Sequence, residues 1–233
     1  MKSMFAAVSC ITLALLAVEQ SRGDDKKPQE IKGWGKVVDP DGDCKVKEEK
    51  GKLTITVPDT LHNLNPAIAS NAPRVLQEVE GDFVATVKVT GEFKPGQKAT
   101  KPTGYPFNGA GLLIWKDDKN CVRLERNIWW MPDQGMHACY PPLLEYYKDG
   151  VYQNTNPPGT TDEFFKGRST YVRLERKGDK VAASYSHDGK EWMAVKEITV
   201  DLPKKVHVGV AAVNSSDKPF TVEFEDFKIA AGK

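Results

Sequence analysis

Helical periodicity and the common catalytic signatures are both missing from this sequence. No segment of ten residues repeats its apolar residues at helical spacing, which argues against an α-helical fold. There is no Gly-x-Ser-x-Gly elbow, phosphate-binding loop or dinucleotide fingerprint. The histidines lack the His-x-x-His or His-Glu spacing of a zinc site. We therefore predict no catalytic residues, no cofactor and no metal ligands; the four histidines are His62, His137, His187 and His207.

An excess of either charge is also missing. The chain has 33 Lys and Arg residues against 32 Asp and Glu residues, a formal net charge of +1. Such a balance gives no overall field that would attract nucleic acid or an anionic membrane. After the first 23 residues, no stretch is apolar enough to cross a bilayer as a helix. We therefore expect no nucleic-acid partner and no membrane span in the mature chain.

The first 23 residues form the only long apolar run. Lys2 supplies a positive start, Met4–Val18 is apolar, and Ser21-Arg22-Gly23 offers small residues at the positions that a signal peptidase reads. We interpret residues 1–23 as a signal peptide and expect a secreted or periplasmic protein. Residues 24–33 are polar and are expected to form a flexible leader, and residues 34–230 are expected to form a single domain.

Cysteine is scarce: the chain has four, and three remain once a signal peptide that contains Cys10 is removed. Cys44, Cys121 and Cys139 remain, so at least one has no partner within the chain. If 120–127 and 135–140 pair antiparallel around Trp130, Cys121 lies opposite Cys139, close enough for a disulfide. The alternative is three free thiols, and the sequence leaves both open.

Alternation of apolar and polar residues is present almost everywhere else. KLTITV (52–57) and DFVATVKVTGEF (82–93) alternate with a period of two, and GAGLLIW (109–115) is apolar on both faces. In the last segment the apolar phase shifts near Glu225-Asp226, which predicts a β-bulge. About a dozen short strands predict an all-β jelly-roll sandwich of two antiparallel sheets.

An ordered series of segments carries a family resemblance over nearly the whole mature chain. These segments include DPDGDC, KLTITVP, HNL, NAPR, GAGLLIW, VRLER, SYSHDGKEW, VGVAAVNSS and PFTVEFEDFKI. The series resembles a concanavalin-A-like lectin/glucanase family of unknown function, the regulation-of-enolase type of secreted bacterial domain. That resemblance implies two curved antiparallel sheets related to lectins and glucanases. It implies no activity and supplies no catalytic residues.

CVRLERN (121–127) recurs fifty residues later as YVRLERK (171–177), and each copy places Arg-x-Glu on one side of a strand. If both copies share a sheet with GMHACY and LLEYYK, one concave face gathers guanidinium, carboxylate and aromatic groups. Such groups suit the hydroxyls and the ring faces of a glycan. The predicted ligand-binding residues are Arg123, Glu125, His137, Glu145, Tyr147, Arg173 and Glu175.

The same face has two other interpretations. Cross-strand charge pairs stabilise a sheet without any ligand, so it could be a self-paired lattice in a structural or protein-interaction module of the cell envelope. It could also belong to a divergent glycoside hydrolase or lyase, which needs two carboxylates, one with a raised pKa. Neighbouring arginines are expected to lower the pKa of these glutamates, which argues against catalysis. The favoured interpretation is an exported, non-catalytic module that binds a polysaccharide or other glycan weakly; the sequence leaves its oligomeric state open.

Three further motifs have plain interpretations. DPDGDC spaces Asp39, Asp41 and Asp43 like a calcium loop, but Cys44 and Lys50 stand where that loop needs Gly and Glu, so an Asx-rich turn is expected. SYSHDGKEW is interpreted as a hairpin with an Asp-Gly type I′ turn. Trp129 and Trp130 are placed in a loop or hairpin tip, where they either stack on a sugar or cover the core.

Overall fold

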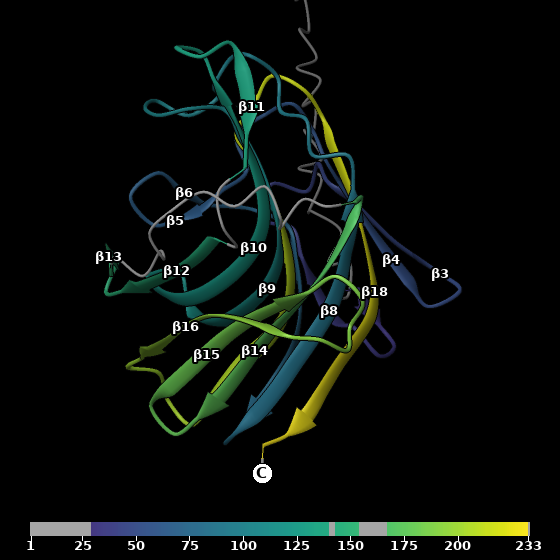
Figure 1. Ribbon diagram of the computed structural model, residues 1–233, viewed down its shortest axis with the longest axis vertical. Coiled ribbons are helices and arrows are strands. Elements are labelled where there is room, and N and C mark those ends of the chain that lie inside the picture. The colour runs from purple at the N-terminus through teal and green to yellow at the C-terminus, as the bar shows by residue number, and fades with distance from the viewer. Residues whose placement is uncertain (1–28, 140–142, 154–166, 233) are drawn as a thin grey trace, which may run out of the picture.

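Two large antiparallel sheets make up the fold in a computed structural model that describes residues 29–139, 143–153 and 167–232. Sheet A has the strand order β1-β2-β7-β17-β9-β10-β12-β13, with β11 added beside β10. Sheet B has the order β16-β15-β14-β8-β18-β4-β3, and β5 pairs with β6 separately. Figure 1 shows β8, β14 and β18 of sheet B lying across the curved strands β9 and β10 of sheet A. The predicted all-β jelly-roll sandwich is confirmed.

The strand bounds follow the alternation in the sequence. Sheet A consists of β1 (Glu30–Ile31), β2 (Gly35–Val38), β7 (Arg74–Glu80), β9 (Phe107–Asp117), β10 (Asn120–Met131), β11 (Met136–Ala138), β12 (Leu143–Lys148), β13 (Val151–Tyr152) and β17 (Lys205–Asn214). Sheet B consists of β3 (Lys45–Glu49), β4 (Lys52–Val57), β8 (Phe83–Gly91), β14 (Ser169–Lys177), β15 (Lys180–Ser186), β16 (Met193–Thr199) and β18 (Phe220–Ala231). The short pair is β5 (Leu64–Asn65) and β6 (Ala69–Ser70).

The core lies between the two sheets and is built from one side of each strand. In β4 and β8 every second residue is buried, because successive side chains of a strand point to opposite faces. The central strand β9 is buried on both faces over most of its length, as its sequence predicts. A second apolar cluster lies on the other face of sheet A and includes Leu64 of β5, Trp115 of β9 and Tyr147 of β12. Sheet A is therefore covered on its outer face as well.

The structure tests two local predictions, the β-bulge in the last strand and the turn at Asp188-Gly189. The β-bulge is confirmed: the β18–β8 register shifts between Glu225 and Lys228, and Asp226 has a positive φ of 55°. The SYSHDGKEW turn is not of type I′, because only Gly189 of the Asp188-Gly189 pair has a positive φ. Asp188 instead accepts hydrogen bonds from the backbone N–H groups of Lys190 and Glu191, at 2.8 and 3.0 Å.

The N-terminal expectations are tested only in part. The predicted signal peptide and residues 24–28 of the predicted leader lie outside the described residues. The leader prediction is wrong for Glu30 and Ile31, because these residues form β1 and pair with β2. Ile31 is apolar and packs into the core, which fixes this end of the chain. Within the described part of the chain, no helix has the length and apolarity needed to cross a membrane.

Candidate functional site

The two VRLER copies lie in different sheets, so the predicted common face is wrong. The first copy is in β10 of sheet A and the second is in β14 of sheet B. Leu124 and Leu174 both belong to the core between the sheets, which confirms that the apolar positions point inward. Their Arg and Glu residues therefore face opposite exteriors of the sandwich. A period of two specifies which side chains face inward, but it does not specify which sheet a strand joins.

The predicted position of His137 and the predicted Cys121–Cys139 disulfide both assumed a strand pairing that differs from the one in the structure. The partner of β10 opposite Cys121 is Tyr147 of β12, whereas β11 pairs only with the far end of β10. Cys121 and Cys139 are therefore far apart in register, and Cys44, Cys121 and Cys139 form no disulfide with one another. His137 pairs with Trp130 of β10. Trp130 is an odd number of residues from Arg123 and Glu125, so its side chain points to the opposite face of sheet A. His137 therefore also lies on the face opposite to Arg123 and Glu125. Its Nε2 lies 2.9 Å from the Pro95 carbonyl oxygen.

Four of the predicted residues do come together on the outer face of sheet A, and a fifth residue joins them. Arg123 donates from Nε to Glu145 Oε2 at 2.7 Å, its Nη2 donates to the same oxygen, and its Nη1 donates to Glu125 Oε1 at 3.2 Å. The Tyr147 hydroxyl also donates to Glu145 Oε2, at 3.1 Å. Because strand alternation places Asn127 beside Glu125 on this face, we define the Arg123 cluster as Arg123, Glu125, Asn127, Glu145 and Tyr147.

Two polar atoms of the Arg123 cluster are buried and have no hydrogen-bond partner among the described residues. These atoms are Glu125 Oε2 and Asn127 Nδ2, and the two residues are 1% and 0% exposed. The other Asn127 atom, Oδ1, accepts a hydrogen bond from Trp129 Nε1 at 2.8 Å. A Cβ atom at Gly109 would lie 2.5 Å from Glu125 Oε2, so glycine leaves the space that this carboxylate occupies. Buried polar groups without partners are uncommon in proteins, and each calls for an explanation such as a bound water, an ion or a polar group of a ligand.

Burial dominates the electrostatics of Glu125. It raises the pKa of Glu125 to about 7, against the opposing effect of Arg123 and with the help of nearby Glu145. Arg123 does lower the pKa of Glu125, as expected, but burial outweighs it, so the expectation of a lowered pKa is wrong. The opposing effect of Arg123 is limited because it directs two of its N–H groups to Glu145 and only one, at 3.2 Å, to Glu125. Burial also raises the pKa of the Tyr147 hydroxyl.

An aromatic surface covered by a lysine adjoins the Arg123 cluster. Phe107 and Trp129 are stacked with ring centroids 4.7 Å apart and an interplanar angle of 16°. Lys101, from the loop between β8 and β9, places Nζ 4.8 Å and 4.7 Å from the two ring centroids. Burial and the charge of Arg123 lower the pKa of Lys101 to about 8. The ammonium group is therefore poorly solvated where it lies.

Trp129 and Trp130 lie in β10 and not in a hairpin tip, which corrects their predicted location. They point to opposite faces of sheet A, because they are adjacent in a strand. Trp129 joins the aromatic surface, whereas Trp130 makes an edge contact with His137, with ring centroids 5.0 Å apart. Figure 1 shows β11 and the end of β10 extending beyond the sandwich.

The second VRLER copy has simpler surroundings on the outer face of sheet B. Arg173 stacks on Trp192, with its guanidinium carbon 3.6 Å from the ring centroid. Glu175 is exposed to solvent. These two residues are separated from the Arg123 cluster by the whole sandwich, so they take no part in that site.

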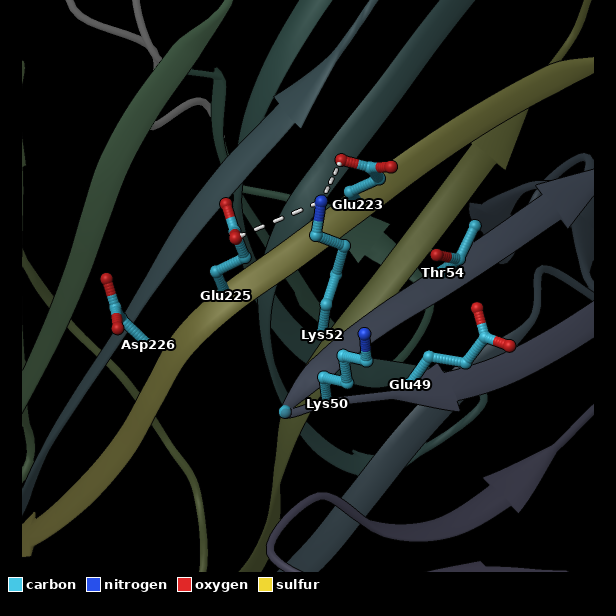
Figure 2. Close-up of a pocket in the computed structure, with 8 residues that line it drawn as sticks. Glu49, Lys50, Lys52, Thr54, Glu223, Glu225 and Asp226 are labelled. Carbon is cyan, nitrogen blue, oxygen red and sulfur yellow. Dashed lines mark hydrogen bonds and ion pairs between the residues drawn. The ribbon is translucent and has the colours of Figure 1, made fainter.

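Sheet B also carries an open, charged hollow between β4 and β18. Figure 2 shows Lys52 reaching across to Glu223 and Glu225, at 2.9 and 4.0 Å. Lys88 pairs with the same Glu225 at 3.3 Å. The charges of this hollow are paired with one another and partly exposed to solvent, which is the usual state of a stabilising surface network. The Arg123 cluster differs because its unpaired atoms are buried.

Sequence reasoning missed Asn127, Lys101 and the position of Phe107. Asn127 could have been found, because it lies two residues after Glu125 and shares its face of the strand. Lys101 comes from a loop rich in Gly, Pro and Lys, which has no periodicity to place it. Phe107 begins β9, where it is buried and stacks on Trp129.

Comparison with known proteins supports the fold and a family of unknown function. A model of a protein family of unknown function (DUF1349) matches residues 158–231. The match covers the C-terminal third of the chain. It does not include β9, β10 or β12, which carry the Arg123 cluster. No sequence match was found among curated proteins. None of these comparisons shows the resemblance to the regulation-of-enolase type of domain that the sequence suggested.

Solved structures share the fold at low identity. A functionally unknown protein from Saccharomyces cerevisiae matches with a TM-score of 0.57 and 16% identity, over 81% of this chain and 92% of that protein. The GH43 protein BlXynB from Bacillus licheniformis matches with a TM-score of 0.58 and 14% identity. The match covers 84% of this chain but only 36% of the GH43 protein. A legume lectin-like domain from Entamoeba histolytica has a TM-score of 0.51 and 10% identity, over 84% of this chain and 89% of that domain. At these identities the likeness establishes a lectin-like sandwich fold and nothing about activity.

Proposed function

We propose that this protein is an exported, non-catalytic β-sandwich that binds a glycan at the Arg123 cluster on the outer face of sheet A. The observation that carries the proposal is the pair of buried atoms without partners, Glu125 Oε2 and Asn127 Nδ2. A lattice that only stabilised the sheet would satisfy its own polar atoms, since leaving such a group buried and unpaired costs about 1–3 kcal/mol. An acceptor and a donor side by side match the hydroxyl groups of a sugar.

The aromatic surface supplies the other half of a sugar site. Sugar rings present apolar C–H faces, and aromatic side chains in binding sites provide the flat apolar area that such faces cover. Phe107 and Trp129 adjoin Asn127 through the Trp129 Nε1 hydrogen bond. A sugar could therefore contact the rings and the unpaired polar atoms together. The lectin-like fold of the Entamoeba histolytica domain is consistent with this role.

In this proposal Lys101 is a displaceable cover over the aromatic surface. Its ammonium group lies over both rings, and no carboxylate among the described residues forms an ion pair with it. A lysine side chain is long and flexible, and its charge is more stable in water than in this partly buried position. A glycan that occupies the ring faces would move Lys101 outward at little cost.

The test compares equivalent positions of the two VRLER copies. Glu125→Gln should weaken glycan binding at least ten-fold at pH 8, because the charged acceptor is lost while the side chain keeps its shape. Glu175→Gln, in the copy on sheet B, should bind like the wild type. Binding is measured by screening the mature protein on a glycan array and then titrating the best glycan in solution.

Two results would overturn the proposal. A silent array at high protein concentration would favour the alternative, a structural or protein-interaction module of the cell envelope. Equal binding by Glu125→Gln and wild type would move the glycan site away from the Arg123 cluster.

Lys101→Ala should bind the same glycan several-fold more tightly than the wild type. Removing the side chain exposes the Phe107–Trp129 surface before the sugar arrives, so binding no longer includes the displacement of an ammonium group. Lys98→Ala, in the same loop, is the matched control and should leave affinity unchanged. Weaker binding by Lys101→Ala would show that Lys101 contacts the sugar directly and is not a cover. Titration calorimetry gives both affinities.

Glycan cleavage is the second candidate function, because the pKa of Glu125 near 7 suits a general acid. A glycosidase would need Glu125 and a second carboxylate, and Glu145 is the nearest candidate on this face. Release of reducing sugar by the wild type, abolished in Glu125→Gln and retained in Glu175→Gln, would establish this activity in place of simple binding.

A further inference from the structure

A mixed cluster of nitrogen, sulfur and oxygen donors lies at one end of the sandwich, apart from the Arg123 cluster. Asp43 and Cys44 belong to the loop between β2 and β3, and His62 precedes β5. One ligand atom from each of these three residues lies within 4.8 Å of the other two. Asp41, from the same loop, places Oδ2 3.8 Å from His62 Nε2. We propose that Asp41, Asp43, Cys44 and His62 form a binding site for one Zn²⁺ or a similar late transition-metal ion, and we name it the rim site.

The donor spacing fits one tetrahedral ion. Zinc bonds of about 2.3 Å to sulfur and about 2.0–2.1 Å to nitrogen and oxygen place neighbouring donor atoms roughly 3.3–3.5 Å apart. In the rim site, His62 Nε2 is 2.9 Å from Asp43 Oδ1, and Cys44 Sγ is 3.6 Å from the same oxygen. The third separation, from His62 Nε2 to Asp41 Oδ2, is 3.8 Å. These three separations lie within about 0.5 Å of that spacing, and a fourth separation, between Cys44 Sγ and the ligand nitrogen of His62, is within 4.8 Å.

His62 is held in a fixed position, as a metal ligand needs to be. It is 0% exposed, and its backbone exchanges two hydrogen bonds with Asn214 at the end of β17, at 2.8 and 3.0 Å. Its Nδ1 lies 3.4 Å from the Thr60 carbonyl oxygen. Without a metal ion, Nε2 donates its proton to Asp43 Oδ1 at 2.9 Å. A bound ion would replace that proton, and Nδ1 would then carry the proton toward the Thr60 carbonyl, an arrangement common to metal-bound histidines.

The surrounding charges favour a cation. Asp39, Asp41 and Asp43 crowd one turn, and of the described Lys and Arg residues none forms an ion pair with them. The Oδ1 atom of Asp39 is buried and has no hydrogen-bond partner in the part of the chain that the structure describes, and Asp39 Oδ2 accepts from the backbone N–H of Cys44. The side chains of Asp41 and Asp43 are 44% and 43% exposed, so an ion can enter from solvent.

The ligand types select the metal. A thiolate and an imidazole favour zinc and other late transition metals, whereas calcium and magnesium prefer a shell made of oxygen atoms only. The spacing of the aspartates alone resembles a calcium loop, but Cys44 and His62 change the preference. The site is independent of glycan binding at the Arg123 cluster.

The test uses Co²⁺ as a spectroscopic substitute for Zn²⁺ in the metal-free, reduced mature protein. We expect one Co²⁺ per chain, with visible bands of a tetrahedral ion and a sulfur-to-cobalt charge-transfer band that Zn²⁺ abolishes by displacement. Cys44→Ser should lose the charge-transfer band. Asp43→Asn, an exposed position that keeps the loop shape, should weaken binding more than ten-fold. Cys139→Ser and His187→Gln are the matched controls and should behave like the wild type.

Three outcomes would overturn the rim site. The first is no Co²⁺ or Zn²⁺ binding at protein concentrations used for titration. The second is binding that survives in both Cys44→Ser and Asp43→Asn, which would indicate an adventitious ion only. The third is Ca²⁺ binding tighter than Zn²⁺ and unaffected by Cys44→Ser, which would indicate an oxygen-only acidic loop.

Discussion

Replacing Arg123 with alanine should lower the free energy of unfolding by about 3–5 kcal/mol, whereas Arg173→Ala should lower it by about 1 kcal/mol or less. The two arginines occupy equivalent positions of the repeated VRLER motif. Only 3% of the Arg123 side chain is exposed, and it bonds both Glu125 and Glu145. Its removal leaves two carboxylates without their shared cation in a buried place. Arg173 is partly exposed, and its removal loses the stacking on Trp192 and a solvent-screened attraction to the exposed Glu175.

Urea denaturation of both variants and of the wild type measures this difference, provided that the slope with denaturant is unchanged. If Arg123→Ala does not fold, Arg123→Lys provides the comparison: it keeps the charge but loses the planar fork, and it should still be clearly less stable than Arg173→Lys. Similar losses for the equivalent substitutions at 123 and 173 would contradict the prediction and would mean that the Arg123 cluster is not buried in solution.

The wild type should lose stability as the pH rises from about 4.5 to about 7, by up to about 3 kcal/mol, through Glu125 alone. The folded-state pKa of Glu125 is raised to about 7, above the ordinary value of an unfolded chain. The folded state therefore holds this proton more tightly than the unfolded state does. The stabilisation is fully present below the unfolded pKa and is lost as the pH rises through the folded pKa.

Glu125→Gln isolates this contribution from those of the other titrating groups. Glutamine resembles the protonated glutamate, so the variant and the wild type should have similar stability near pH 5, and the variant should be the more stable near pH 8. Glu175→Gln is the control, because Glu175 is exposed and should not alter the pH profile. A stability difference between Glu125→Gln and wild type that stays constant from pH 5 to pH 8 would show that the Glu125 pKa is not raised. Thermal and urea unfolding across that range provide the measurement.

The inward faces of the strands were predictable from the sequence because alternation is a local property. Leu124 and Leu174 lie in the core as their motif indicates, and the phase change around Asp226 marks a true bulge. The pairing of strands was not predictable in the same way. The segment after β10 was expected to pair with β10 so that Cys139 lay opposite Cys121. In the structure, Tyr147 of β12 lies opposite Cys121. Register between strands depends on turn geometry and on packing against the rest of the sheet, which a local pattern does not record.

The candidate sites show the same division between local and long-range information. Arg123, Glu125, Glu145 and Tyr147 were predicted because they lie on two strands that are close in the chain and alternate in the same way. Lys101 and His62 were not placed, because each reaches its site from a loop whose path depends on long-range contacts. His62 lies 19 residues from Asp43 in the chain, yet their side chains are 2.9 Å apart.

The sequence by itself determined an all-β sandwich, the inward residues of its strands and the bulge in its last strand. Only the tertiary structure decided that the two VRLER copies belong to opposite sheets, because identical alternation is compatible with either sheet. It also decided that Arg123 and Glu125 are buried while Arg173 and Glu175 are not. Burial is set by which loops and strands cover a face, and it raises the pKa of Glu125 where the sequence indicated that it would fall.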